Sequence, residues 1–310
     1  MYAELVCGPP GSGKTTYCEG RRQYLTMQGR KVITINLDPA NDGVFPYPCN
    51  IDVGDLVSHE AVMEAEHLGP NGAYLFCMEY LSQHTDWLVE RIREQQKRVD
   101  SEPMNPEDPF SPPAASGQNA PTWLLIDCPG QVEYYLHSEA MQGIINSIQK
   151  VLRYTVCVVH LCDAAIATRD VSTYVSTCLL ALSTMTDLEL PHLNVLTKWD
   201  TVVKVEREVP HDGSEPARPD LFHGAGTKAH EEMEPYLETP TFLDDHFRRL
   251  WKEQHGTSAH DSDKRCKMAK TLLEVVDGYN LVSFMPLDVQ HGGMMAAIGE
   301  QVDAAVGHFV

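Results

Sequence analysis

The stretch from Gly8 to Thr15 reads GPPGSGKT, which fits the pattern G-x-x-x-x-G-K-[ST] and directly follows a short apolar run. Its glycines let the main chain curl so that successive N–H groups point inward at an anion. Lys14 adds a point charge for the outer phosphates, and the Thr15 hydroxyl is placed to bind Mg²⁺. The helix that is expected to start near Thr15 brings the positive end of its dipole to the same spot.

This pattern predicts a strand, a loop and a helix that together hold a nucleoside triphosphate. The predicted binding residues are Gly8, Gly11, Ser12, Gly13, Lys14, Thr15 and Thr16. The alternative is a glycine-rich turn that precedes a helix and binds nothing.

The composition limits the classes of protein that the chain can belong to. It has 310 residues, 43% of them hydrophobic, and a net charge of −20. This length suffices for one large α/β domain or two small ones. The excess of carboxylates repels a phosphate backbone, so no direct binding of nucleic acid is expected. No run approaches the roughly 20 apolar residues of a membrane span, so no membrane partner is expected either.

The nine cysteines include no C-x-x-C pair. That spacing fits neither a zinc site nor a compact disulfide framework, and it favours a reducing compartment. The N-terminus also lacks the pattern of a secretory signal. We expect a cytoplasmic protein with access to the nucleus.

Short apolar runs alternate with longer helical patterns, which is typical of a mostly parallel sheet covered by helices. Strands are predicted at Tyr2–Cys7, Lys31–Asn36, Trp123–Asp127, Thr155–Leu161, His192–Leu196 and Leu281–Met285. Helices are predicted at Thr15–Met27, Asp55–Leu68, Tyr74–Val99 and Val132–Ile148. The sequence therefore predicts an α/β fold of the P-loop NTPase type, with a mostly parallel six-stranded sheet flanked by helices.

Two segments interrupt this rhythm within a predicted single domain of residues 1–310. Residues 100–121 are rich in proline and predict a flexible insertion, because they cannot bury enough apolar surface to order themselves. Residues 208–277 begin with a second polar stretch. They continue with the predicted helices Phe242–Gln254 and Lys264–Asp277, which would form a small helical insertion before the last strand.

A second motif follows the apolar run that ends in Asp127, where the chain continues as D-x-x-G to Gly130. An aspartate at the end of a buried strand beside a phosphate loop is where a Mg²⁺-associated carboxylate of such folds lies. Gly130 can bring its N–H close to the terminal phosphate. Gln131 can orient a hydrolytic water with its amide. Alternatively, Gln131 and Glu133 are exposed residues at the start of the next helix.

A third motif, Thr197-Lys198-Trp199-Asp200, again follows an apolar strand. The Asp200 carboxylate can accept hydrogen bonds from N1–H and the exocyclic amine of guanine, whereas adenine offers no such pair of donors. The Lys198 stem can lie over the purine ring. Threonine stands at position 197 where the usual pattern has asparagine, so part of a base contact is lost. The motif favours guanine.

With these motifs in place, the chain resembles the GPN-loop GTPases from about residue 2 to about residue 300, the two polar insertions excepted. The resemblance is carried by Asn36-Leu37-Asp38-Pro39-Ala40-Asn41, Asp52-Val53-Gly54-Asp55-Leu56, Leu68-Gly69-Pro70-Asn71-Gly72, Cys77-Met78-Glu79-Tyr80-Leu81, Asp127 to Glu133 and Leu281 to Leu287. The sequence of these segments is most similar to the second of three eukaryotic paralogues.

The resemblance implies a dimeric Mg²⁺-dependent GTPase that cycles between GTP and GDP. It implies that Asn71 reaches toward the partner subunit's terminal phosphate, although the same turn also reads as a plain helix terminator. Asp38 and Gln131 would position water, and Lys14 would neutralise charge. Thr15, Asp127 and Asp38 would face the metal, and the Leu287 N–H would meet the guanine carbonyl.

The resemblance also implies a role in assembly and nuclear import of RNA polymerase II. The partners would be paralogous GTPases, polymerase subunits or assembly chaperones, in a homodimer or a heterodimer. Two alternatives remain. One is a GTP- or GDP-binding scaffold without catalysis, and the other is an ATP-dependent small-molecule kinase of similar architecture.

Overall fold

Seven parallel strands form the sheet of the computed structural model, in the order β3-β2-β4-β1-β5-β6-β7. They are β1 (Tyr2–Cys7), β2 (Lys31–Asn36), β3 (Ile51–Asp52), β4 (Thr122–Asp127), β5 (Thr155–Asp163), β6 (His192–Thr197) and β7 (Phe284–Leu287). The structure describes residues 1–41, 43–101, 121–131, 139–203, 236–237, 259–279 and 281–308. The predicted α/β class with a mainly parallel sheet is confirmed.

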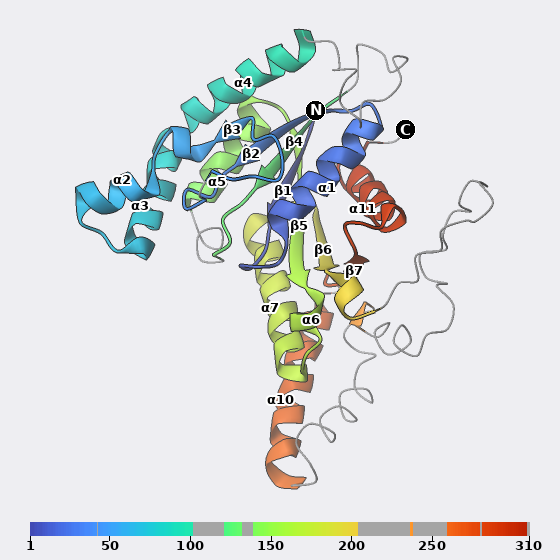
Figure 1. The fold of residues 1–310 in the computed structure, drawn as a ribbon. Helices are drawn as coiled ribbons and strands as arrows, with labels where there is room; N and C mark the ends of the chain where they lie inside the picture. Colours follow the sequence, from blue (N-terminus) through green and yellow to red (C-terminus); the bar gives the residue numbers. More distant parts are fainter. Residues whose placement is uncertain are drawn as a thin grey trace, which may run out of the picture. The chain divides into compact units, whose positions relative to one another are not determined.

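The helices are coloured along the chain in Figure 1. They are α1 (Lys14–Met27), α2 (His59–Glu66), α3 (Pro70–Gln83), α4 (Thr85–Ser101), α5 (Glu139–Asn146), α6 (Ala164–Ala167), α7 (Val171–Leu188), α10 (Ala259–Gly278) and α11 (Gly292–Ala305). Short 3-10 or π turns are η1 (Val53–Asp55), η3 (Ser147–Val151) and η4 (Trp199–Thr201). None of the described helices combines the length and the apolar character that crossing a membrane requires.

The chain divides into two compact units. Unit 1 comprises Met1–Leu161, Asp187–His192 and Val302–Val310, and unit 2 comprises Cys162–Thr186 and Leu193–Gln301. Unit 1 contains the ends of β1, β2 and β4, which precede the phosphate loop, Asp38 and the D-x-x-G motif. Unit 2 contains the candidate base-reading motif.

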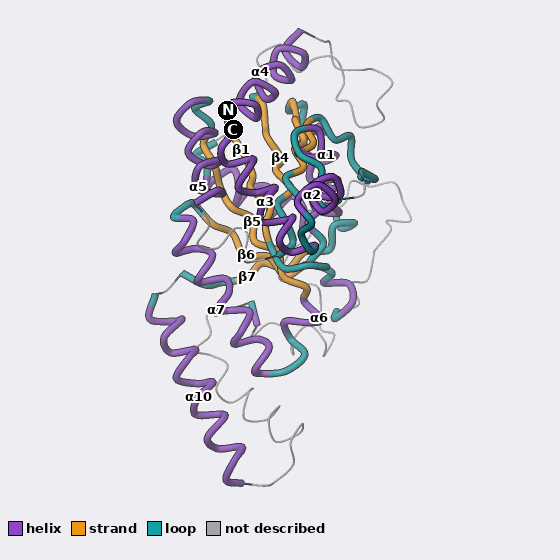
Figure 2. Tube along the Cα trace, turned by 90° about the vertical axis from the view of Figure 1, so that its left-hand side faces the viewer, coloured by secondary structure: helices purple, strands orange, loops and turns teal. Residues whose placement is uncertain are grey.

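In unit 1, helices cover both faces of the strands. Alternate residues of a strand point to opposite faces. On β1, Ala3 and Leu5 join a buried apolar cluster with side chains from α3, α4 and α5. Glu4 points the other way, where it contacts Tyr17 and Arg21 of α1. Figure 2 accordingly shows α1 and α5 on opposite sides of the orange strands.

The strand register brings three motif segments of unit 1 to one edge of the sheet. Asp127 on β4 is the register partner of Val6 on β1 and of Asn36 on β2. Because all three strands are parallel, the segments that follow them leave the sheet side by side. These segments begin the phosphate loop, the stretch around Asp38 and the D-x-x-G motif.

Unit 2 pairs β6 with β7 in parallel, from Asn194 opposite Phe284 to Thr197 opposite Leu287. Its helix α10 spans 20 residues. The C-terminal part of the predicted accessory region is therefore helical, in agreement with the predicted helix Lys264–Asp277. The predicted helix Phe242–Gln254, residues 102–120 of the proline-rich insertion, residues 208–235 of the polar stretch and Glu133 lie outside the described residues.

Several predictions of secondary structure were wrong. The strand β3 was missed, because two residues carry no periodic signal. The predicted helix Tyr74–Val99 is two helices, α3 and α4, which meet at the non-helical His84 (φ −117°, ψ 38°). The predicted helix Asp55–Leu68 is the shorter α2, which Ser58 caps by accepting the Ala61 N–H.

Candidate nucleotide-binding site

The loop between β1 and α1 has the backbone shape that a phosphate cradle needs. Gly8, Gly11 and Gly13 all have positive φ, of 145°, 76° and 89°. The Lys14 side chain folds back over the loop, and its Nζ donates hydrogen bonds to the carbonyl oxygens of Gly8 (3.1 Å) and Pro9 (3.3 Å). Gly13 is the N-cap of α1 and provides no side-chain acceptor. The first N–H groups of α1 can therefore bind an anion.

A close contact requires glycine at position 8, and Gly130 lies against the lysine of the loop. A Cβ on Gly8 would lie 2.2 Å from the Leu161 carbonyl oxygen. A Cβ on Gly130 would lie 3.3 Å from Lys14 Nζ. The structure thus places the glycine of the D-x-x-G motif directly against the lysine of the phosphate loop. Ser12 is buried within the same loop, and Thr15 and Thr16 follow on the first turn of α1.

Asp127, at the end of β4, is a buried carboxylate, and one of its oxygens accepts no hydrogen bond from the described residues. Its Oδ2 accepts a hydrogen bond from the Tyr47 hydroxyl (3.0 Å), whereas Oδ1 is buried and has no hydrogen-bond partner among the described residues. Burial raises the pKa of Asp127 to about 6, and the nearby Thr15 hydroxyl, Tyr47 hydroxyl and Lys14 ammonium counter part of this shift. A buried carboxylate oxygen without a donor is costly unless a cation reaches it.

The donors around Asp127 fit Mg²⁺. They are oxygens only, from Asp127, Thr15 and Asp38, and such hard oxygen ligands suit this ion. Within the described ranges no cluster of three or more His, Cys, Asp or Glu side chains could hold a metal. Proteins usually hold Mg²⁺ at phosphates through one or two side chains, water and the phosphates themselves.

Asp38 lies just after β2 and is held by several hydrogen bonds. Its Oδ1 accepts from the Tyr74 hydroxyl (2.9 Å) and from the Ala40 N–H (3.0 Å). Asn36 bonds to both sides of its main chain, donating to the Asp38 carbonyl (2.9 Å) and accepting from the Asp38 N–H (3.2 Å). The carboxylate therefore has a fixed position at the edge of the sheet where the phosphate loop begins.

The Gly69-Pro70-Asn71 segment opens a helix and does not form a terminating turn. Gly69 is the N-cap of α3 and Pro70 is its first residue, a position that suits proline because the missing N–H is not needed there. All three residues are exposed. His59 of α2 lies against this start, with Nε2 2.9 Å from the Pro70 carbonyl oxygen. The interpretation as a plain helix terminator was therefore wrong.

Gln131 is exposed and is the last described residue before a gap at 132–138. Unit 1 thus brings together the phosphate loop, Gly130, Asp127 and Asp38. It leaves Gln131 and Asn71 on the surface.

In unit 2, the candidate base-reading segment has an ordered backbone. The buried Thr197 hydroxyl donates to the Cys162 carbonyl oxygen (3.1 Å). Lys198 has a left-handed conformation (φ 54°), and the next residue, Trp199, is buried. Asp200 is exposed on η4. Thr197 is also the register partner of Leu287 on β7, so two segments predicted to contact guanine are neighbours in the sheet.

Comparison with known proteins decides the family. A family model described as "Conserved hypothetical ATP binding protein" matches residues 6–308. GPN-loop GTPase QQT1 of Arabidopsis thaliana is 32% identical over 308 residues, which cover 99% of this chain and 86% of that protein. GPN-loop GTPase 2 of Danio rerio is 33% identical over 308 residues, covering 99% and 81%. The chain belongs to the GPN-loop GTPase family.

The predicted family and its enzyme class, a GTPase, are thereby confirmed. GPN-loop GTPase 3 of Mycosarcoma maydis is also 33% identical, over 305 residues that cover 98% of this chain and 91% of that protein. The crystal structure of PAB0955, a GTPase in apo form from Pyrococcus abyssi, is similar with a TM-score of 0.64 at 20% identity. The similarity covers 98% of this chain and 97% of that chain, and it shows the shared fold.

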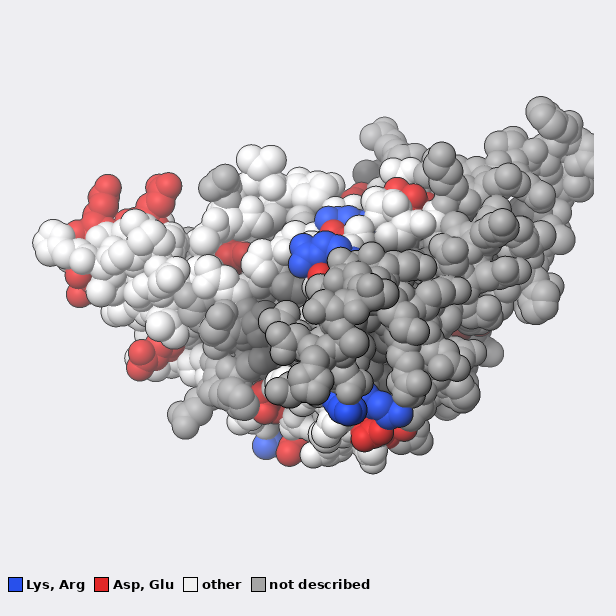
Figure 3. Space-filling view, turned by 90° about the horizontal axis from the view of Figure 1, so that it is seen from below, with Lys and Arg blue, Asp and Glu red and all other residues white. Residues whose placement is uncertain are grey.

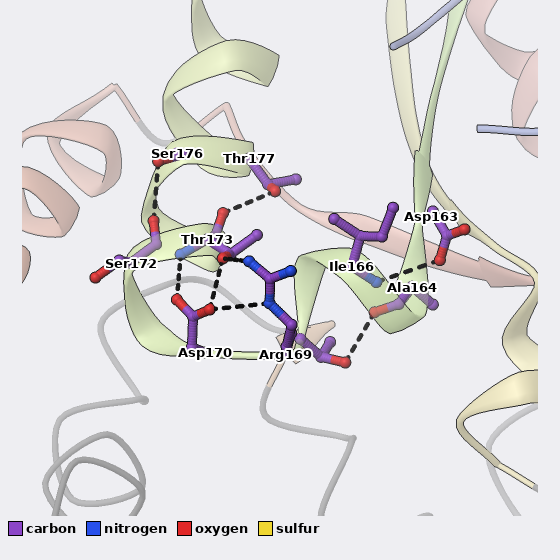
Figure 4. Close-up of polar contacts among 10 residues, drawn as sticks. Asp163, Ala164, Ile166, Arg169, Asp170, Ser172, Thr173, Ser176 and Thr177 are labelled. Atoms are coloured by element: carbon purple, nitrogen blue, oxygen red, sulfur yellow. Dashed lines mark hydrogen bonds and ion pairs between the residues drawn. The ribbon is translucent and has the colours of Figure 1, made fainter. Parts of the chain in front are cut away.

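Sequence reasoning missed three residues that support the motifs of this GPN-loop GTPase. They are Tyr47 on Asp127, Tyr74 on Asp38, and Asp163 on Lys198. Figure 4 shows Asp163 at the start of α6, where its Oδ1 accepts hydrogen bonds from two N–H groups (2.9 and 3.2 Å). Its Oδ2 receives Lys198 Nζ (2.8 Å). The lysine predicted to lie on the purine is thus anchored at its tip.

Proposed function

We propose that this chain binds GTP with Mg²⁺ and hydrolyses it as a dimer. The observation that carries the proposal is the buried Asp127 Oδ1, which has no hydrogen-bond donor in the described part of the chain. It lies beside a phosphate loop whose lysine is bonded only to loop carbonyls in the contacts of the described residues. Mg²⁺ would supply the missing partner of Asp127 Oδ1, and a triphosphate would give Lys14 an anionic partner in place of the carbonyls.

The residues of unit 1 divide the chemistry among them. Lys14 would exchange its bonds to loop carbonyls for bonds to the outer phosphates, while Thr15 and Asp127 hold the metal. Bound Mg²⁺ would neutralise charge on the phosphates. Asp38 and Gln131 would orient the water whose oxygen bonds to the terminal phosphorus as the bond to the GDP oxygen breaks.

The dimer is supported by the surface around the start of α3. Leu68, Leu75 and Phe76 are large apolar residues that are 37%, 59% and 37% exposed on either side of Gly69–Asn71. Apolar side chains that gather around an exposed polar turn are typical of a protein contact. Asn71 would then present its amide to the terminal phosphate of the partner's GTP.

Specificity for guanine would rest on unit 2. Asp200 is exposed and can pair with the two donors of the guanine edge, and the Lys198 stem is held by Asp163. The Leu287 N–H would meet the guanine carbonyl. Threonine at position 197 is engaged with a main-chain carbonyl, so it does not replace the missing asparagine contact.

For the cellular role we propose assembly and nuclear import of RNA polymerase II, in the cytoplasm with access to the nucleus. The partners would be paralogous GTPases, polymerase subunits and assembly chaperones. On the face seen in Figure 3, the blue Lys and Arg side chains of the described residues form small groups beside red ones. This distribution, with the net charge of −20, favours protein partners over nucleic acid.

The test combines turnover with mass in solution. The full chain is measured with GDP, and then with a non-hydrolysable GTP analogue and Mg²⁺, while phosphate release is followed at increasing protein concentration. We expect a dimer with the analogue and turnover that rises with dimerisation. Asp38→Ala and Gln131→Leu are expected to bind GTP without turnover. Equal turnover by monomer and dimer would contradict the dimeric mechanism. If the wild type turned over GTP no faster than the two variants, the chain would instead be a nucleotide-binding scaffold without catalysis.

A further inference from the structure

Tyr74 connects the exposed start of α3 to the carboxylate of Asp38. We propose that Tyr74 is a positioning residue: its hydroxyl fixes Asp38 relative to the Gly69-Pro70-Asn71 segment, so that a second subunit docking on this segment sets the rate of hydrolysis. The inference rests on the proposed function. In it, dimerisation affects the attacking water through Tyr74 and Asp38.

Asp38 is held both from its own loop and from α3. The Tyr74 hydroxyl donates to Oδ1 at 2.9 Å, and the Ala40 N–H donates to the same oxygen at 3.0 Å. Ala40 lies two residues away in the same loop, so its bond follows the loop wherever it moves. In the hydrogen bonds of the described residues, Tyr74 supplies the contact to the Asp38 carboxylate from a separate helix. The orientation of this carboxylate therefore depends on the position of α3.

Tyr74 lies on the same helix as the exposed segment. Asn71 and Tyr74 are three residues apart on one helix, so they lie on the same face, about 4.5 Å apart along the axis. His59 contacts Pro70 and Tyr74 of this helix: its Nε2 is 2.9 Å from the Pro70 carbonyl oxygen, and its ring packs edge-on against the Tyr74 ring, with centroids 6.0 Å apart. His59 therefore links the start of α3 to the Tyr74 ring.

The Tyr74 hydroxyl acts through its hydrogen bond and not through packing. Tyr74 is 4% exposed and belongs to the buried apolar cluster, where a phenylalanine would fill nearly the same volume. A buried hydroxyl costs free energy unless it is bonded, so its contribution depends on the Asp38 contact. Removing it keeps the packing and leaves the carboxylate bonded to Ala40 of its own loop, without the contact from α3.

The experiment compares Tyr74→Phe with Tyr80→Phe in the full chain. Tyr80 lies on the same helix, and its ring stacks on His84 with no contact to Asp38 in the described structure. We expect Tyr74→Phe to lower kcat of the dimer by about tenfold, the effect of one hydrogen bond to a charged group. The KM for GTP and the analogue-driven dimer are expected to stay as in the wild type. Tyr80→Phe is expected to change none of these.

A second variant keeps the proposal testable if Tyr74→Phe does not fold. His59→Ala leaves both Tyr74 and Asp38 in place and loosens their link to the exposed segment, so it is expected to lower the ratio of dimer to monomer turnover. Wild-type kcat in Tyr74→Phe, or a loss equal to that in Tyr80→Phe, would overturn the inference and leave the proposed function standing. A wild-type chain without GTP turnover would overturn both.

Discussion

The Glu4 carboxylate on β1 and the Arg21 guanidinium on α1 form an ion pair fully shielded from solvent, with Oε1 and Nη2 2.8 Å apart. The Tyr17 hydroxyl donates to the other Glu4 oxygen at 3.0 Å. β1 leads into the phosphate loop and α1 leads out of it. The buried pair therefore fixes the two ends of the loop relative to each other.

Glu4→Gln is expected to lower the free energy of unfolding by about 3–5 kcal/mol, because Arg21 would remain charged and buried without its partner. Urea unfolding followed by circular dichroism measures the change. The matched control is Glu19→Gln on the same helix, since Glu19 pairs with Arg22 at 2.8 Å but both side chains are partly exposed. That variant is expected to cost about 0.5 kcal/mol or less. Equal effects of the two variants would contradict the role of the buried pair.

The motifs could be placed from the sequence because each follows a strand and occupies a short, continuous stretch. Asp127, Asp38 and the phosphate loop come together through strand register alone, which is a consequence of parallel pairing. Tyr47 and Tyr74 could not be found in this way. Each reaches its aspartate from a distant segment, and nothing in the spacing of a single tyrosine indicates such a contact.

The helix α7 also escaped prediction, for a local physical reason. Its sequence, VSTYVSTCLLALSTMTDL, is rich in β-branched and hydroxyl residues that usually weaken helices. In the structure these hydroxyls bond to carbonyls one turn earlier, as with Ser176 to Ser172 and Thr177 to Thr173 (Figure 4). The side-chain hydroxyls thus make their hydrogen bonds within the helix, and helix propensities do not take these bonds into account.

Tyr47→Phe is expected to weaken Mg²⁺ binding in the presence of GTP by about tenfold, the usual effect of removing a partner of a metal-binding carboxylate. The reason is that Asp127 loses the hydroxyl that orients it. The measurement is a Mg²⁺ titration of GTP turnover. Tyr24→Phe on α1, whose hydroxyl accepts from Gln28 at the surface, is the control and should leave the titration unchanged. Identical titrations for both variants would show that the Tyr47 hydroxyl does not affect Mg²⁺ binding.

Gly8→Ala is expected to abolish most GTP binding. The residue has φ 145°, and its added Cβ would lie 2.2 Å from the Leu161 carbonyl oxygen, so the loop must move. A cost of about 3 kcal/mol corresponds to roughly a hundredfold loss of affinity. Gly307→Ala is the control, because it also has a positive φ (71°) but nothing lies within 4 Å of its added Cβ. Calorimetric titration with GTP should show the loss in the first variant alone.

Asp200→Asn is expected to exchange guanine for xanthine as the preferred base. The asparagine keeps one acceptor and gains an N–H donor, which opposes the guanine amine and matches the carbonyl that xanthine has in its place. An unpaired donor of this kind costs about 1–3 kcal/mol, so GTP affinity should fall by roughly tenfold or more while xanthosine triphosphate binds better. Competition of GTP, xanthosine triphosphate and ATP for one fluorescent nucleotide measures all three affinities.

The control for this exchange is Asp163→Asn, which makes the same chemical change at the anchor of Lys198. It should weaken GTP and xanthosine triphosphate alike, because it loosens the lysine without touching the edge of the base. A wild-type preference for ATP would point to the kinase alternative. A GTP preference that survives in Asp200→Asn would place the base away from Asp200, since asparagine cannot accept hydrogen bonds from both guanine donors.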